Sequence, residues 1–434
     1  MSFITKENTD IGERYYYTQH KSGLPVYVFP KKHSTAFAVL GTKYGSADTT
    51  FKTDKDDDFF TIPDGVAHFL EHKLFEDENG NDAFTRYAKY GGNANAFTSF
   101  VRTAYLFSCT GNFDENLEVL LDFVTCPYFS EKSVKKEQGI IGEEIKMYED
   151  NPGWRVFFNM LGAMYINNPV RKDIAGTVES ISEITPEILY KCYNTFYNLH
   201  NMALCVCGDV TPEQVEAVCD RVLKKAENIK IERYTPDEPP HINTERVTLE
   251  LEVAQPVFSI GIKDTPANTP EEAMRRDAET EIILQLLFGR SGDFYNRHYE
   301  SGLINHKFSA SYEQARSYAY TEISGSCEDP DLVKKAVCEE ITHRRDNFFT
   351  AEEFETAKRV VYANNLHNFD STEDIATDFL SYVFAESDIL DYPAVISGVT
   401  YEDAKNTFLS SFDINKSVLS IIFPKNKEVI KDDE

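Results

Sequence analysis

The chain has 434 residues, of which 72 are acidic and 44 basic, and its formal net charge at pH 7 is −28. So acidic a chain argues against nucleic acid and against an anionic membrane as partners. No apolar run approaches the roughly 18 residues that a membrane-spanning helix needs. The length is too great for one hydrophobic core, so two or three domains are expected.

The N-terminal segment, residues 1–8, has neither a basic stretch nor an apolar core, so neither a signal peptide nor a transit peptide is expected. The eight cysteines include no C-x-x-C pair, and reduced thiols in a chain without an export signal fit the cytoplasm. Cys205 and Cys207 lie in an apolar run at residues 202–208. Alternate residues of a strand share a face, so we expect both to be small core residues.

The first predicted strands are apolar runs at residues 24–30 and 36–42. Further along, the Pro-Asp-Gly sequence at residues 63–65 precedes an apolar-rich run. Asp64 is a suitable N-cap residue for a helix. We therefore predict that a short helix starts after Asp64.

This predicted helix carries His68, Glu71 and His72 in the order His-x-x-Glu-His. Residues i and i+4 of a helix lie one above the other, so both histidines can reach one ion. Glu71 lies near the same ion but is badly placed to bind it, and is free to take a proton from a metal-bound water. The order is the reverse of H-E-x-x-H and is the inverzincin signature. Two histidines, a carboxylate and one open position describe a catalytic zinc site. A packed, hydrogen-bonded pair of histidines is the alternative.

Residues 93–100 alternate small or polar side chains with aromatic ones after a Gly-Gly turn, and a further strand is predicted at residues 103–109. An exposed edge strand can hydrogen-bond an extended peptide as an added strand. The alternative is a buried hairpin strand without a role in binding. The residues expected to bind substrate are Asn95, Ala96, Phe97 and Thr98.

The third metal ligand is expected on a helix that Ser130 can cap and that must end at the Asn-Pro-Gly sequence of residues 151–153. Glu137 and Glu144 are seven residues apart and fall on its apolar side. An ionised carboxylate on an inward face is costly unless it is paired or bound to a metal. Glu144 is therefore the expected third ligand, and Glu137 is expected to orient a histidine or the metal-bound water. Alternatively, both are ordinary surface glutamates.

Charge and proline dominate residues 229–248, which form the predicted linker between a metal-bearing domain at 1–228 and a second domain at 249–434. The second half restarts with strands and a helix. These elements are expected at residues 256–262, 270–288 and 318–324. It has no His-x-x-Glu-His sequence, so it is expected to bind substrate rather than metal.

Residues 65–75, around the histidine motif, resemble the zinc motif of the M16 family of peptidases. Glu137 and Glu144 match the family's distal glutamates. The segments that match further family landmarks are residues 91–99, 175–181 and 196–202. The resemblance extends from about residue 12 to residue 425 and is closest to the bacterial branch in which one subunit carries two homologous domains.

The resemblance implies an α+β fold of two homologous domains, each a mixed, mainly antiparallel β-sheet packed against helices. It implies one zinc ion per chain, held by His68, His72 and Glu144, with Glu71 as general base. The implied activity is that of a zinc endopeptidase that hydrolyses peptides or small unfolded polypeptides in an enclosed chamber.

The second half departs from the family pattern. The family's second domain usually supplies an Arg and a Tyr, about seven residues apart, that reach the substrate near the zinc. Here Tyr299 occupies the Arg position, and Arg297 lies two residues early. We therefore expect a dimer, and specifically a heterodimer with a zinc-less paralogue that supplies the Arg/Tyr pair. Alternatively, Arg297, His298 or Tyr299 is a local substitute, or all three form a solvated helix face.

Two other functions stay open at this point. The chain can be the catalytic subunit of a heterodimer that matures one specific peptide, or a non-catalytic scaffold subunit of the same family. The complete set of His68, Glu71, His72 and Glu144 argues against the scaffold, which has no need of costly inward carboxylates. Manganese or cobalt can replace zinc in such a ligand set.

Overall fold

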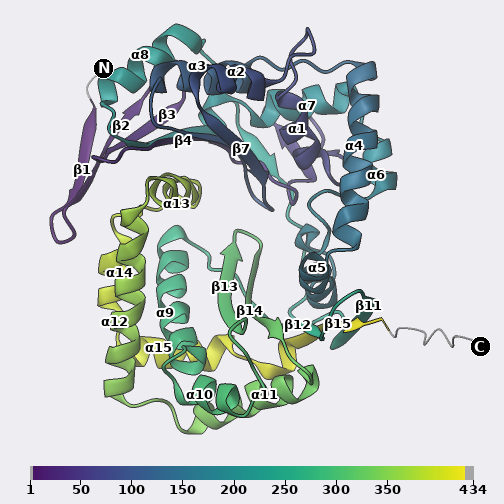
Figure 1. The fold of residues 1–434 in the computed structure, drawn as a ribbon, viewed down its shortest axis with the longest axis vertical. Coiled ribbons are helices and arrows are strands. Elements are labelled where there is room, and N and C mark those ends of the chain that lie inside the picture. The colour runs from purple at the N-terminus through teal and green to yellow at the C-terminus, as the bar shows by residue number, and fades with distance from the viewer. Residues whose placement is uncertain (1–2, 426–434) are drawn as a thin grey trace, which may run out of the picture. The chain divides into compact units, whose positions relative to one another are not determined.

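The computed structural model describes residues 3–425 of the chain (Figure 1). The described residues form two compact units, each built from separate segments. The first unit comprises residues 3–145, 173–235 and 362–397, and the second comprises residues 146–172, 236–361 and 398–425. Among the described residues, no helix combines the length and the apolar character needed to cross a membrane.

The first unit contains a seven-stranded sheet with the order β1-β2-β3-β9-β4-β8-β7. The β3–β9 pair is parallel and the other neighbours are antiparallel, so β7 is an edge strand. The strands are β1 (Ile4–Asn8), β2 (Glu13–Gln19), β3 (Pro25–Pro30), β4 (Ala36–Thr42), β7 (Asn93–Thr98), β8 (Thr103–Cys109) and β9 (Met202–Gly208). A smaller sheet has the order β10-β5-β6, with β5 at Thr50–Thr53, β6 at Phe60–Thr61 and β10 at Ile231–Arg233.

Helices cover both faces of the large sheet. On one face, Phe379 of α13 packs edge-on against Tyr15, Tyr27 and Phe29. Helices α1 and α3 lie on the other face (Figure 1). There Tyr105 of β8 packs against Phe123 of α3. The helices of this unit are α1 (Val66–Leu74), α2 (Ala83–Tyr90), α3 (Phe113–Thr125), α6 (Val178–Ser182), α7 (Pro186–Phe196), α8 (Pro212–Val222), α13 (Thr372–Phe384) and α14 (Tyr392–Gly398). Two more helices, α4 (Glu131–Glu149) and α12 (Ala351–His367), each continue from one unit into the other.

The second unit contains a five-stranded sheet with the order β11-β15-β12-β14-β13. Its strands are β11 (Arg246–Leu251), β12 (Val257–Asp264), β13 (Ser309–Ala315), β14 (Tyr318–Ser326) and β15 (Ser417–Pro424). Its helices are α5 (Pro152–Met164), α9 (Pro270–Phe288), α10 (Asp293–Glu300), α11 (Pro330–Asp346) and α15 (Tyr401–Ser411).

The two sheets repeat one topology. The order β3-β9-β4-β8-β7 in the first unit corresponds to β11-β15-β12-β14-β13 in the second. In both series the first pair is parallel and the later pairs are antiparallel. The predicted fold class, α+β with two homologous domains of mixed sheets and helices, is therefore confirmed. The predicted strands and helix of each half are also present, and the helix at residues 270–288 coincides with α9.

The predicted domain ranges, 1–228 and 249–434, are continuous, whereas both compact units are discontinuous. The reason is visible in the first unit, where apolar residues of α13 such as Phe379 and Leu380 complete the core over β4 and β9. That core also contains Cys205 and Cys207, so the prediction that both are small core residues is confirmed.

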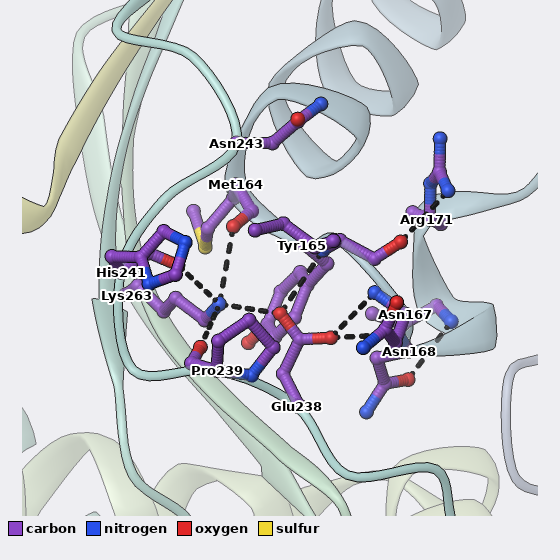
Figure 2. A network of polar contacts seen from close by, with 12 residues as sticks. Met164, Tyr165, Asn167, Asn168, Arg171, Glu238, Pro239, His241, Asn243 and Lys263 are labelled. Atoms are coloured by element: carbon purple, nitrogen blue, oxygen red, sulfur yellow. Dashed lines mark hydrogen bonds and ion pairs between the residues drawn. The ribbon is translucent and has the colours of Figure 1, made fainter.

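The predicted linker, residues 229–248, is anchored within the second unit at Glu238 (Figure 2). The Glu238 carboxylate accepts hydrogen bonds from the backbone N–H groups of Ile166, Asn167 and Asn168 at 3.0, 2.7 and 2.8 Å. The buried Lys263 ammonium lies 2.5 Å from Glu238 Oε1 and also donates to the carbonyl oxygens of Pro239 and His241 in the linker loop, at 2.8 and 2.9 Å. These contacts fix the loop to β12 and to the segment that follows α5.

Lys263→Met should destabilise the protein by about 3–5 kcal/mol, because it leaves a largely buried carboxylate without its counter-ion. Urea unfolding measures the change in the free energy of unfolding. Lys335→Met is the matched control, since this lysine side chain is 69% exposed. Equal effects of the two substitutions would contradict the stabilising role of the buried pair.

Candidate active site

Helix α1 begins at Val66 after Gly65, which has a left-handed backbone conformation with φ of 92°. The N-cap position is Gly65, which has no side chain to cap the helix, so the predicted N-cap, Asp64, is wrong by one residue. A Cβ atom at Gly65 would lie 2.5 Å from the carbonyl oxygen of Ala175. The close approach of that distant loop, together with the positive φ, requires glycine at the start of the helix.

The three predicted metal ligands come together from two helices. His68 and His72 lie on α1, and Glu144 lies on α4. Glu144 Oε1 is 3.7 Å from His68 Nε2, and Glu144 Oε2 is 3.3 Å from His72 Nε2. One ligand atom from each residue lies within 4.8 Å of the other two. Two imidazoles and one carboxylate in this arrangement fit a catalytic zinc ion, which takes three protein ligands and keeps one position open.

The two histidines differ in their pKa. Burial, together with repulsion from His72, lowers the pKa of His68 to about 4, so its ring is neutral at pH 7, as a ligand must be. Its buried Nδ1 atom has no hydrogen-bond partner in the described part of the chain. Burial acts to lower the pKa of His72, but hydrogen bonds to Glu137 and Glu144 outweigh it and raise the pKa to about 10. The two carboxylates therefore favour positive charge at the place where a divalent cation would supply it.

Glu137 lies seven residues before Glu144, about two helical turns away on the same face of α4, and is buried. Its Oε1 is 3.1 Å from His72 Nδ1, while His72 Nε2 faces Glu144. A carboxylate on the second ring nitrogen fixes the tautomer and the orientation of a metal-binding histidine. The structure thus places Glu137 where the sequence predicted a residue that orients a histidine.

The predicted course of α4 is also found. Ser130 Oγ accepts a hydrogen bond from the backbone N–H of Ser133 at 3.2 Å. The helix ends at Glu149, and Asn151 caps the next helix. Glu143 is exposed, in contrast to Glu144, as the helical period requires.

Glu71 lies one residue before His72 on α1 but is not part of the three-residue ligand group. Thr98 Oγ1, at the end of β7, donates a hydrogen bond to Glu71 Oε2 at 2.6 Å. Burial raises the pKa of Glu71, and the hydrogen bond from Thr98 and the proximity of His72 act in the opposite direction. A carboxylate with a raised pKa beside the ligand group can accept and release a proton.

The four residues predicted to bind substrate lie on β7, which pairs with β8 and forms the edge of the sheet. Side chains alternate along a strand, and the four therefore point in two directions. Phe97 packs against the core beneath α13, whereas Thr98 points toward Glu71. The exposed Asn95 side chain accepts a hydrogen bond from the N–H of Ala96 at 2.9 Å. The part of β7 that an extended peptide could contact along its whole length is therefore the backbone edge of the strand.

Arg297, His298 and Tyr299 lie on α10, which belongs to the second unit. Arg297 Nη2 is 3.6 Å from a carboxylate oxygen of Glu340 on α11. Burial lowers the pKa of His298, and Tyr299 is 50% exposed. Their role as substrate contacts stays a prediction.

Sequence reasoning missed a second link between α1 and α4. The side chain of Lys73, directly after His72, is fully buried and pairs with Glu76 at 2.6 Å. Glu76 also lies 3.3 Å from Lys136 Nζ, one residue before Glu137. A lysine directly before the apolar pair Leu74 and Phe75 was the available signal, because a buried ammonium requires a partner.

Two family models match the chain. "Insulinase (Peptidase family M16)" matches residues 62–178, and "Peptidase M16 inactive domain" matches residues 183–361. The uncharacterized zinc protease YmfH of Bacillus subtilis is 39% identical over 425 residues, which cover 97% of this chain and 99% of YmfH. The chain therefore belongs to peptidase family M16.

Solved structures agree with this assignment. An "M16-like peptidase" from Alicyclobacillus acidocaldarius matches with a TM-score of 0.91 and 33% identity, over 98% of this chain and 99% of that one. A protease from Helicobacter pylori matches with a TM-score of 0.79 and 19% identity, over 95% of this chain and 100% of that one. At that identity the second match shows the shared fold alone.

Glu137→Gln should weaken zinc binding by about 10–100-fold, because His72 loses the carboxylate that orients it. Competition with a chelating dye measures the zinc affinity. Glu143→Gln on the exposed face of the same helix is the control. If both variants bind zinc as tightly as the unmodified chain, Glu137 does not orient His72.

Proposed function

We propose that this chain is a zinc-dependent endopeptidase that binds one zinc ion and hydrolyses peptides or small unfolded polypeptides. The observation that carries the proposal is the convergence of His68, His72 and Glu144, with Glu71 beside them. The 39% identity to a protein named as a zinc protease supports it. The enclosed chamber implied by the family resemblance stays a prediction.

In this proposal each side chain near the ligand group has a separate task. When bound, zinc lowers the pKa of water and polarises the carbonyl group of a peptide bond. Glu71 accepts the proton of the attacking water and later passes it to the leaving amine. Glu137 holds the His72 ring through Nδ1.

The edge strand β7 suits an extended peptide. Its outer backbone groups have no partner strand among the described residues of the sheet, and an added strand can hydrogen-bond to such an edge. A peptide bound as an added strand is held mainly through hydrogen bonds to its backbone and less through its side chains. We therefore expect broad sequence specificity.

Glu71→Gln should retain zinc and lose about 10²–10⁴-fold in peptide hydrolysis, because the amide cannot accept the proton. Zinc per chain and the hydrolysis of a quenched fluorogenic peptide are the two measurements. Glu78→Gln, in the exposed loop after α1, is the control. Full activity of Glu71→Gln would exclude Glu71 as the base, and an unmodified chain that binds no zinc would exclude the proposed function.

We also propose that the active form is a dimer, and specifically a heterodimer with a zinc-less paralogue. The support is that α10 offers no Arg/Tyr pair at the family spacing and that Arg297 is engaged by Glu340. The partner would supply the Arg/Tyr pair that contacts the substrate carbonyl. The eight free cysteines are consistent with a reducing cytoplasm as the place of action.

The heterodimer proposal predicts that the chain alone hydrolyses peptides slowly and that adding the paralogue raises kcat. Substituting the Arg of the partner's pair should remove this gain, because the substrate carbonyl loses a donor. In the mixture, Arg297→Ala should leave most of the activity. The proposal fails if the chain alone works at full rate and Arg297→Ala abolishes that activity.

A further inference from the structure

Two neighbouring threonine hydroxyl groups lie between Glu71 and the loop that follows β4. Thr98 Oγ1 lies 2.6 Å from Glu71 Oε2 and 3.4 Å from Thr103 Oγ1. Thr103 Oγ1 lies in turn 2.9 Å from the carbonyl oxygen of Tyr44. Thr98 and Thr103 are directly opposite each other in the β7–β8 pair, so the two hydroxyl groups are held by the register of the strands.

The acceptors fix the direction of the two shorter hydrogen bonds, and because each hydroxyl group has one hydrogen, none is left for the 3.4 Å contact between the two threonines. A carbonyl oxygen only accepts, so the hydroxyl hydrogen of Thr103 is used on Tyr44. An ionised carboxylate also only accepts, so the hydroxyl hydrogen of Thr98 points at Glu71. Hydrogen bonds to a charged acceptor at this distance are about twice as strong as neutral ones. Thr98 therefore holds one oxygen, Oε2, of the Glu71 carboxylate.

Thr98 was expected to contact substrate, yet the side chain faces α1 rather than the open edge. Ala94 and Ala96 occupy the same side of β7, because they alternate with Asn95 and Phe97. Small residues there leave α1 close to the strand, and Thr98 is the residue of β7 whose side chain is bonded to Glu71. A peptide would meet the backbone of β7, not this hydroxyl.

We infer that Thr98 is a positioning residue for Glu71: its hydroxyl fixes Oε2 and thereby directs Oε1 toward the proton that the base accepts. This inference rests on the proposed function, since it assigns to Thr98 a task within that reaction. It also places the anchor of the base on the strand to which substrate would be added. The register of the β7–β8 pair and the orientation of the Glu71 carboxylate are thus linked.

The test compares variants that differ in the hydroxyl group. Thr98→Val keeps the branched shape and should lower kcat by about 10–100-fold, because small misplacement of a reacting group has effects of that size. KM should stay close to that of the unmodified chain, since the peptide contacts backbone. Thr98→Ser restores a hydroxyl at the same atom and should recover most of the loss in kcat.

Thr61→Val on β6 is the matched control, because it also removes a strand hydroxyl group that faces another threonine hydroxyl, here at 3.0 Å and in the separate small sheet. It should leave kcat and KM unchanged. Thr98→Ala is the second variant without a hydroxyl if the valine variant does not fold. The alanines at positions 94 and 96 show that this side of the strand accepts a methyl group.

A readout independent of activity is the crystal structure of each zinc-loaded variant. The Glu71 carboxylate should leave its position in Thr98→Val and keep it in Thr98→Ser. The inference is overturned if Glu71 stays in place in both, if the valine variant changes KM rather than kcat, or if serine rescues nothing. An unmodified chain that binds zinc but hydrolyses no peptide, even with the paralogue added, refutes the proposed function, whereas the position of Glu71 still decides whether Thr98 holds it.

Discussion

The candidate site depends on the packing of two helices that carry opposite chemistry. Helix α1 supplies two imidazoles, and α4 supplies two carboxylates, one on each side of the His72 ring. Inward carboxylates are costly unless they meet donors or a cation. The ion pairs of Glu76 with Lys73 and Lys136 hold the same two helices together at a second point. Any shift of α4 along α1 would separate Glu144 from both histidines at once.

The third element of the site is the edge strand. Thr98 joins β7 to Glu71, and Thr103 joins β8 to the loop at Tyr44. The ligands are therefore set by helix packing, while the base is set by strand register. These are different constraints, and a change in one of them can leave the other intact. This division explains how zinc binding and turnover can respond separately to substitution.

Much of the fold could be predicted from periodicity. The helical period placed Glu137 and Glu144 on one face of α4 and Glu143 outside it, and the strand at residues 36–42 coincides with β4. The start of α1 could not be predicted, because the conformation at Gly65 is imposed by contact with a loop more than one hundred residues away. The direction of the Thr98 hydroxyl has the same kind of cause. Local patterns record which face a side chain takes, but not which distant group meets it there.

The division of the chain had no local signal either, since α13 follows more than one hundred residues of the second unit and completes the core of the first. A fragment that stopped at residue 235 would contain every residue of the ligand group, yet the apolar side of β4 and β9 would face water. The complementary fragment would lack α5, which packs on β12 and β15. Each half of the duplicated fold therefore borrows a helix from the other, and gene splitting at the linker would be expected to yield two insoluble pieces rather than two working halves.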